Sequence, residues 1–337
     1  MNTFKVRDMD RRKFLAAGAF ACLASQAEQL TAQVTPASAE RWRPPTPTLG
    51  GKQLWADVWF FHQYRIQKNV MTGHHRLLDP NNMRLVWGTL DACQAKLAEV
   101  RSAKALPAMT GPGVVMLHGL LRTRASMKPL CDYLRIQGGY SVFDVGFPTS
   151  HGGVADHAQA FDSVMQSLAG LSEIHFIGHS LGNIVIRYWL HEMTTNGQRA
   201  DLRPPFGRMV MLAPPNQQPE IAVALIRGDG VKGIAGRAAA DLAEGWTELG
   251  PKLAVPPFEF GILAGGRGND RGYNPVLEGD DDGVVTVEST RLTGAADFRR
   301  LDAIHALFTS AAPVRRMTLR FLREGSFEGE RNRQPIV

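Results

Sequence analysis

Apolar residues in the last two thirds of the chain fall into short continuous runs that alternate with runs at helical spacing. A short apolar run without polar interruption is typical of a strand that is buried on both faces of a sheet. Strands are therefore predicted at Val114–Leu117, Tyr140–Val145, Ile174–Ile177, Arg208–Ala213 and Phe258–Leu263.

Helices are predicted where apolar side chains recur every three or four residues. These stretches are Met127 to Leu134, Val154 to Leu168, Ser180 to Met193 and Val314 to Leu322. The alternation predicts an α/β fold built on a doubly wound, mostly parallel sheet with helices on both faces. In such a sheet the reacting groups are expected at the carboxyl ends of the strands.

The chain before this alternation has a different character. Residues 40–50 are rich in proline and are expected to form a linker, Leu54 to Val70 suggests strands without clean periodicity, and Leu85 to Val100 is predicted to be helical. We therefore divide the chain into an N-terminal extension at 40–107, a main domain at 108–325 and a C-terminal tail at 326–337. No apolar run reaches the length that spans a bilayer.

The first 39 residues resemble an export signal of the twin-arginine type. Arg11 and Arg12 precede the short apolar stretch Phe14 to Ser25, and Ala37-Ser38-Ala39 provides a cleavage site before Glu40. We expect export to the periplasm or beyond, through the export machinery. Two alternatives stay open: a basic start to a buried helix, and a lipid-anchored Cys22, which Ala19-Phe20-Ala21 matches poorly.

The charge and the cysteines limit the partners. Removal of residues 1–39 leaves 33 basic and 29 acidic residues, a net charge of +4. Without long Lys/Arg runs or interleaved aromatics, nucleic-acid binding is not expected, while loose association with an anionic membrane surface stays open. The remaining Cys93 and Cys131 can be free or paired. We expect no metal site and no cofactor.

Gly178-His179-Ser180-Leu181-Gly182 matches the pattern G-x-S-x-G. It directly follows a predicted strand and opens a predicted helix, which is the context that a nucleophile elbow requires. In that sharp turn the serine adopts a strained backbone conformation, and the flanking glycines leave room for neighbouring backbone. Ser180 is therefore the candidate nucleophile.

A serine hydroxyl needs a base to remove its proton. If the base follows the serine in the chain, only His191 and His305 are available. His191 lies eleven residues along the predicted helix, about 16 Å from Ser180 at 1.5 Å per residue, which is too far. His305 is therefore the candidate base.

An acid must orient the base and stabilise its positive form. Asp282 is favoured, because Gly283 and the apolar residues that follow would anchor its loop against the sheet. Asp270 and Asp302 are the alternatives.

Together, His118-Gly119-Leu120, the Ser180 motif, Asp282-Gly283-Val284-Val285 and His305 resemble bacterial lipases and esterases of the α/β-hydrolase superfamily, over residues 110–325. The resemblance implies an oxyanion hole formed by the backbone N–H groups of Leu120 and Leu181. It also implies that Ser180 is acylated and that a water activated by His305 then releases the acid. The segment Met211 to Gln217 resembles the stretch after the sixth strand of such enzymes.

We expect the chain to hydrolyse carboxylic esters, with a small-molecule or lipid ester as substrate. Transfer of the acyl group to another alcohol by the same triad is an alternative, and so is a non-catalytic surface-binding protein on the same fold. Fold alone does not decide between them.

The stretch Gln217 to Pro257 is longer than one connecting helix needs. Its apolar residues are interrupted by four glycines, Gly228, Gly230, Gly233 and Gly236. Small helices joined at these glycines would form a cap that excludes water from the reacting ester. A single sheet-packing helix followed by a surface loop is the alternative.

Overall fold

A computed structural model describes residues 46–47, 52–195, 204–217 and 236–337. The predicted export signal at 1–39 and residues 218–235 of the predicted cap lie outside the described residues. Arg43 to Val337 form one compact unit. No helix in the described part of the chain is long and apolar enough to cross a membrane.

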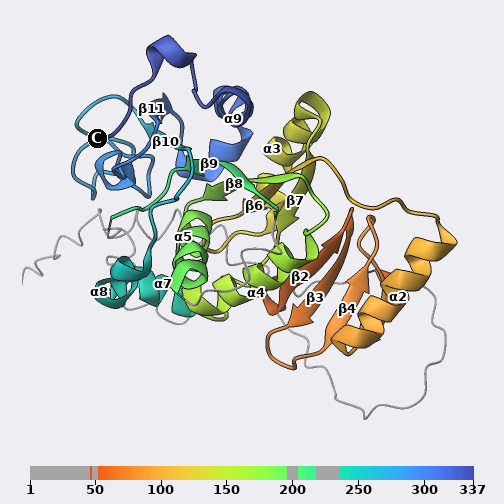
Figure 1. Cartoon of the computed structure of the whole chain (residues 1–337). Helices are drawn as coiled ribbons and strands as arrows, with labels where there is room; N and C mark the ends of the chain where they lie inside the picture. Colours follow the sequence, from red (N-terminus) through yellow and green to blue (C-terminus); the bar gives the residue numbers. More distant parts are fainter. Residues whose placement is uncertain (1–45, 48–51, 196–203, 218–235) are drawn as a thin grey trace, which may run out of the picture. The chain divides into compact units, whose positions relative to one another are not determined.

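A six-stranded parallel sheet forms the centre of this unit (Figure 1). Its strand order is β11-β10-β9-β8-β6-β7, and every neighbouring pair is parallel. The strands are β6 (Pro112–Leu117), β7 (Ser141–Val145), β8 (Glu173–His179), β9 (Phe206–Leu212), β10 (Phe260–Gly266) and β11 (Asp297–Asp302).

The helices cover both faces of this sheet, which confirms the predicted doubly wound α/β fold. Val115 and Leu117 of β6 pack in one apolar cluster with α4 (Val154–Ser167) and α5 (Leu181–Thr195). Val114 and Met116 face the other way. Their cluster includes α3 (Lys128–Tyr133) and α9 (Ala312–Glu324). The alternation of side chains along one strand therefore supplies two separate cores.

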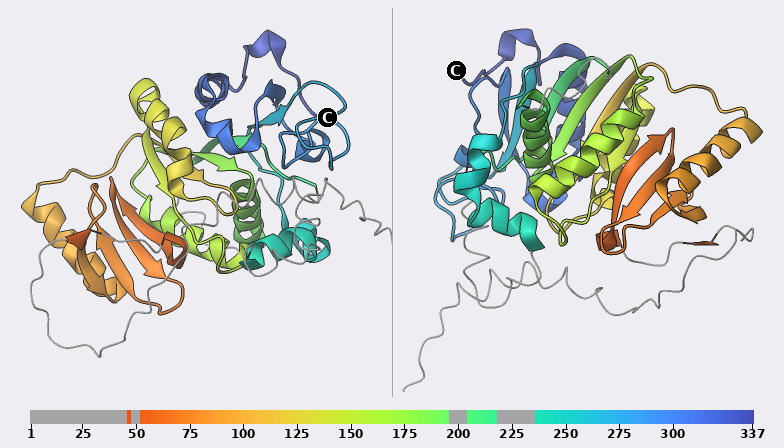
Figure 2. Two further views of the ribbon diagram at one scale, coloured as in Figure 1. Left: turned by 180° about the vertical axis from the view of Figure 1, so that it is seen from behind. Right: turned by 60° about the horizontal axis from the view of Figure 1, so that its bottom comes forward.

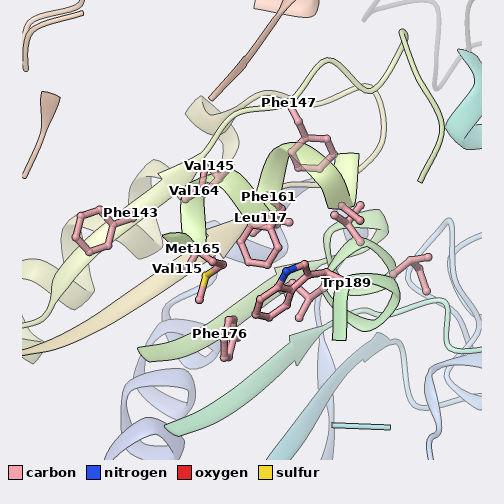
Figure 3. Close-up of a cluster of buried hydrophobic side chains, with 14 of the residues drawn as sticks. Val115, Leu117, Phe143, Val145, Phe147, Phe161, Val164, Met165, Phe176 and Trp189 are labelled. Atoms are coloured by element: carbon pink, nitrogen blue, oxygen red, sulfur yellow. The ribbon is translucent and has the colours of Figure 1, made fainter. Parts of the chain in front are cut away.

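Aromatic side chains fill the first of these cores (Figure 3). The Phe161 and Trp189 rings meet edge to face at 5.0 Å, and Phe176 lies 5.9 Å from Trp189. The indole N–H of Trp189 donates to Asp162, so its polar atom is satisfied. Truncation of a buried phenylalanine of this kind costs about 3–5 kcal/mol.

An antiparallel sheet precedes the parallel one, in the order β1-β5-β4-β3-β2. Helix α2 (Leu90–Ala103) packs against it. Its strands are β1 (Thr46–Pro47), β2 (Trp55–Phe61), β3 (Tyr64–Asn69), β4 (His75–Leu78) and β5 (Met83–Gly88).

The predicted helix at Leu85 to Val100 was wrong in its first turn. Met83–Gly88 is strand β5, and the helix begins at Leu90, where Thr89 accepts a hydrogen bond from the Ala92 N–H as its N-cap. The apolar residues of β5 happen to continue the helical spacing of α2. The threonine cap marks the true boundary.

The antiparallel sheet docks beyond β7, at the opposite end of the parallel sheet from β11 (Figure 2). The Asp57 N–H donates to the Gly146 carbonyl at 2.8 Å, and the Phe60 N–H donates to the Ser167 hydroxyl at 3.0 Å. The Phe60 ring meets Phe143 of β7 at 5.7 Å. The N-terminal sheet thus shares its apolar core with α4 and β7.

Strand β11 forms one edge of the parallel sheet, and the C-terminal residues 326–337 cover that edge. Strand β11 was not predicted, because its sequence is mostly charged; Asp297 is nevertheless buried, and it accepts hydrogen bonds from the N–H groups of Phe327 and Gln334. Residues 326–337 run along this edge, where Phe327 is buried and the Ile336 N–H donates to the Ala295 carbonyl.

The strand order reverses at β6. The chain runs from β6 to β7 at the edge and then returns to β8 on the other side of β6. Leu117 of β6 lies opposite Gly178 of β8 in the register. The loop after β6 and the turn after β8 therefore emerge side by side, at the point where ligands bind in open α/β sheets.

Candidate active site

Ser180 lies in a strained turn between β8 and α5. Its φ angle is +53°, in the left-handed region that non-glycine residues rarely adopt. Its N–H donates to the Leu212 carbonyl at 3.0 Å, so the strained residue is fixed to the neighbouring strand. The serine is 8% exposed, and its hydroxyl makes no hydrogen bond to any residue that the structure describes.

The two glycines of the motif are required by close approaches. A Cβ atom on Gly178 would lie 2.3 Å from the Asn183 side-chain oxygen, and one on Gly182 would lie 2.3 Å from the Leu117 carbonyl oxygen. Real Cβ atoms do not approach so closely. The turn therefore tolerates only glycine at both positions.

Asn183 supports the turn from within helix α5. Its amide donates to the carbonyls of Ser180 and Leu212, both at 3.2 Å, and its side chain is fully buried. Sequence reasoning missed this residue. The available signal was a lone amide directly before the apolar run Ile184-Val185-Ile186.

Asp282 and His305 are brought together. The His305 Nδ1 lies 2.7 Å from the Asp282 Oδ2, and the His305 N–H donates to the Asp282 carbonyl at 2.8 Å. The other carboxylate oxygen, Oδ1, accepts from the N–H groups of Val284 and Val285 at 3.0 and 2.8 Å. Because Asp282 is only 1% exposed, these bonds replace its hydration. The carboxylate therefore orients the imidazole and can stabilise its positive form.

The other aspartates considered as the acid have different partners. Asp280 accepts from the N–H groups of Arg267 and Gly268, and Asp281 accepts from those of Asn274 and Gly283. The two alternative acids do not contact His305 either. Asp302 accepts from the Tyr273 hydroxyl, and Asp270 is exposed. Among the aspartates named here, only Asp282 contacts His305.

The base lies beside the serine turn. The ring of His179, the residue before Ser180, is centred 4.7 Å from the His305 ring. A hydrogen bond between a nucleophile and its base is often formed only when substrate binds. His191 lies near the end of α5, as the sequence predicts for a residue that cannot serve Ser180.

His179 lies against His305 as a neutral neighbour. It is buried between His305 and Phe308, and neither of its ring nitrogens has a partner among the described residues. Burial, together with the charge of a protonated His305, lowers the pKa of His179 well below its usual range. A neutral ring therefore lies against His305.

Leu120 and Leu181 lie on segments that meet at the serine. A Cβ atom on Gly119 would be 3.1 Å from the Ser180 Cβ, so the loop after β6 touches the turn. Leu181 opens α5, and an N–H in the first turn of a helix has no partner within the helix. The Leu120 N–H also makes no hydrogen bond within the described ranges. Both groups can donate to an oxyanion.

His118 holds the loop that carries Leu120. The Phe147 N–H donates to its Nε2 at 3.3 Å, so the proton of the neutral ring lies on Nδ1, which donates to the Gly119 carbonyl at 3.0 Å. Burial lowers the pKa of His118 to about 4, which keeps the ring neutral. Further along the same loop, Leu121 adopts a φ of +54°, and its N–H donates to the Thr149 hydroxyl. Sequence reasoning treated His118 only as part of a motif.

Arg187 of α5 fixes the chain just before the predicted cap and near the end of that cap. It donates to the Asn216 side chain at 3.0 Å and to the carbonyls of Leu253 and Ala254. Asn216 in turn donates to the Thr290 carbonyl at 2.7 Å. The ends of the segment that follows β9 are therefore tied to the helix behind Ser180.

The described part of that segment contains the short helices α7 (Gly236–Ala243) and α8 (Trp246–Leu249). Asp241 of α7 accepts from the Val154 N–H at 2.8 Å, and the backbone of Gly236 lies against that of Ser150. Helix α7 thus packs on the loop after β7, at the same edge as Ser180. Closure over Ser180 stays a prediction.

Cys93 and Cys131 are both buried and free. Burial raises the pKa of Cys93 to about 11 and that of Cys131 to about 12, so both remain protonated thiols. No group of three or more metal-ligating side chains occurs within the residues that the structure describes.

A parallel sheet with helices on both faces and a strained serine turn after a central strand is an α/β-hydrolase fold. Asp282 follows β10, His305 follows β11 and Ser180 precedes both, which is the order in which that fold carries its acid, histidine and serine.

No protein-family model matches the chain, and no curated protein matches its sequence. Among solved structures, the chain is similar to phospholipase PlaB from Legionella pneumophila, at 18% identity and a TM-score of 0.49, over 65% of this chain and 60% of that one. It is also similar to lipase BlEst2 from Bacillus licheniformis in its propeptide form, at 16% identity and a TM-score of 0.47, over 62% and 50% of the two chains. These similarities concern the fold alone.

Proposed function

We propose that this protein is a serine hydrolase that cleaves carboxylic esters through an acyl-enzyme on Ser180. The observation that carries the proposal is the buried Asp282–His305 pair at 2.7 Å beside the strained serine turn. Nucleophile, base and acid in this arrangement are the parts that acyl transfer needs.

In the proposed reaction the Ser180 Oγ attacks the ester carbonyl carbon while the Nε2 of His305 takes the hydroxyl proton. The carbonyl electron pair moves to oxygen, and the N–H groups of Leu120 and Leu181 stabilise the resulting oxyanion. Each such donor is worth about 2.7–4 kcal/mol in the transition state. Collapse of the intermediate expels the alcohol, which receives the proton from His305.

Hydrolysis of the acyl-enzyme repeats these steps with water as the nucleophile. His305 takes a proton from the water, and the proton then returns to the Ser180 oxygen as the acid leaves. Throughout, the Asp282 carboxylate remains ionised and stabilises the imidazolium.

Apolar side chains around His305 support an ester with an apolar acyl chain as the substrate. Ile304 and Leu307 flank the histidine, and they are 38% and 59% exposed. Apolar surface next to a reacting group favours an apolar ligand over a charged one, because its burial removes that surface from water.

Activity-based labelling tests the proposal. A fluorophosphonate probe should label wild-type protein at Ser180, and Ser180→Ala should lose labelling and lose p-nitrophenyl ester hydrolysis by roughly 10⁴-fold or more. Ser163→Ala, a half-buried serine of α4 whose hydroxyl donates to the Gln159 carbonyl, is the matched control and should keep both. Labelling at another serine, or full turnover by Ser180→Ala, would overturn the assignment.

We also infer that residues 1–39 direct export. Arg11→Lys combined with Arg12→Lys should leave a precursor in the cytoplasm, and mass spectrometry of the exported wild type should find Glu40 at its N-terminus. An N-terminus at a lipid-modified Cys22 would make the protein membrane-anchored instead.

A further inference from the structure

A cavity of about 550 Å³, lined in part by charged side chains, lies where the antiparallel sheet meets the carboxyl ends of β6 and β7. Strands β2, β3 and β4 (Figure 1) form one wall, and the segment from Thr123 to Arg135 forms another. His118 and Phe147 also line it, whereas Ser180, Asp282 and His305 do not. The cavity is therefore separate from the candidate active site, and it lies behind the loop that carries Leu120.

Positive side chains outnumber negative ones in the lining. Asp144 is paired with Arg124, and Asp132 with Lys128. Arg65 and Arg76 have no carboxylate partner in the lining. The five cations are Arg65, Arg76, Arg124, Lys128 and Arg135, and the three carboxylates are Asp79, Asp132 and Asp144.

Asp57 lies behind the arginines and neutralises them only in part. Its Oδ1 is 3.9 Å from the Arg65 Nε, which is too long for a hydrogen bond. The same carboxylate already accepts from the Gln67 amide at 2.8 Å and from the Gly146 N–H at 2.6 Å. With Asp57 counted, the five cations still exceed the four carboxylates.

The guanidinium of Arg76 is fixed by contacts with Trp55 and Gln67. Its guanidinium lies 3.9 Å from the centre of the Trp55 ring, and its Nε and Nη2 both donate to the Gln67 side-chain oxygen at 2.9 and 2.8 Å. Its Nη1 has no partner in the described part of the chain. A guanidinium that is already fixed loses little conformational entropy on binding, and its planar donors match phosphate and carboxylate oxygens.

Arg65 has a buried donor that the protein leaves unused. The residue is 5% exposed, and its Nη2 donates to the Asn82 side chain. Its Nη1 is buried and has no partner among the described residues. Leaving such a donor unpaired destabilises the fold, and an anion in the cavity would offset that cost.

We propose that this cavity binds a small soluble organic anion that carries a phosphate or carboxylate group, with Arg65 and Arg76 as its main cationic contacts and the exposed Lys128, which also pairs with Asp132, at its rim. The volume suits a ligand of that size. The inference does not depend on the proposed ester hydrolysis, because the ligand occupies a site without the nucleophile.

Isothermal titration calorimetry on the full chain tests the proposal, with sn-glycerol 3-phosphate and citrate as the organic anions. Inorganic phosphate and neutral glycerol are the comparison ligands. We expect saturable one-to-one binding of at least one organic anion, weaker binding of phosphate and none of glycerol. The affinity should be the same in Ser180→Ala, which separates this site from the candidate active site.

The double variant Arg76→Gln, Lys128→Gln removes two cations whose side chains are partly exposed, so we expect it to fold. It should bind the organic anion at least about tenfold more weakly. Arg84→Gln, on strand β5 and outside the cavity lining, should bind as the wild type does. Absence of saturable organic-anion binding, equal affinities in the two variants, or binding of phosphate as an adventitious ion only would overturn the proposal.

Discussion

Two buried aspartates, Asp282 and Asp57, lie at opposite ends of the parallel sheet and reach burial in different ways. Asp282 accepts from backbone N–H groups two and three residues further along the chain, and its outer oxygen meets His305. Asp57 depends on Gln67 of the neighbouring strand and on Gly146, 89 residues away. One carboxylate is held locally and faces a reacting group, whereas the other is held by distant segments and joins two sheets.

The burial of Asp57 affects its ionisation. Burial raises the pKa of Asp57, although the nearby Arg124 and the Gly146 N–H oppose the rise. The local N–H donors of Asp282 fix a carboxylate that contacts His305, while the distant contacts of Asp57 join the two sheets. Substitutions at the two positions should therefore divide between catalysis and stability.

Asp282→Asn should have the largest effect. The amide keeps an acceptor for Val284 and Val285 but cannot stabilise a positive His305, so kcat/KM for a p-nitrophenyl ester should fall by about 10⁴-fold. The melting temperature should change little. Asp280→Asn is the matched control, because that carboxylate contacts only the N–H groups of Arg267 and Gly268 and the Arg300 side chain. Comparable losses in both variants would refute the role of Asp282.

Asp57→Ala should reverse the pattern. It leaves the Gly146 N–H and the Gln67 amide without their acceptor, which should lower the free energy of unfolding by about 3 kcal/mol. The fraction that remains folded should still be labelled by a fluorophosphonate. Urea denaturation, with labelling below the transition, separates the two effects. If Asp57→Ala kept its stability but lost labelling, the proposed division between catalysis and stability would be contradicted.

Gln67→Leu should be milder. It removes the hydrogen bond to Asp57 and the acceptor of Arg76 but keeps the volume of the side chain, so we expect a loss of about 1–2 kcal/mol in the same denaturation experiment. A loss as large as that of Asp57→Ala would mean that Gln67, rather than the contact to Gly146, holds the sheets together.

The smallest expected effect is the pH dependence of the Asp57 contribution. Because its pKa is raised in the folded state, Asp57 favours folding most below about pH 4, and that contribution is lost as the pH rises through the raised value. The melting temperature of the wild type minus that of Asp57→Asn should therefore be larger at pH 4 than at pH 8. His118, whose pKa of about 4 destabilises the fold as the pH falls below about 6.5, acts in both proteins, but its effect cancels only in part, because the charge of Asp57 raises that pKa against the larger effect of burial. A difference that grows with pH would contradict the sign.

The parts of the site that could be predicted from the sequence are those with local causes. The Ser180 turn needs glycines two residues away on either side, and Asp282 was favoured for Gly283 and the apolar residues after it, of which Val284 and Val285 donate to its carboxylate. Both signals lie within a few residues. Five of the six parallel strands were also predicted, because each is a continuous apolar run.

What could not be predicted depends on contacts between distant segments. Asp57 meets Gly146, and Asn183 meets Leu212 across a strand boundary, so neither role is visible in the sequence nearby. Strand β11 was not predicted for a related reason, because the burial of Asp297 depends on hydrogen-bond donors from residues 326–337. The boundary at Leu90 was missed because apolar spacing alone does not separate β5 from α2.

The paired backbone and side-chain contacts of Asp57 with Gly146 also bear on the order of assembly during synthesis. Asp57 leaves the ribosome well before β7, so the antiparallel sheet must wait for its partner strand. Phe147, the next residue after Gly146, donates to His118 and so steadies the loop that carries Leu120. Correct docking of strands β2 to β5 thus bears on the loop that carries Leu120, which would link the quality of folding to the onset of the proposed activity.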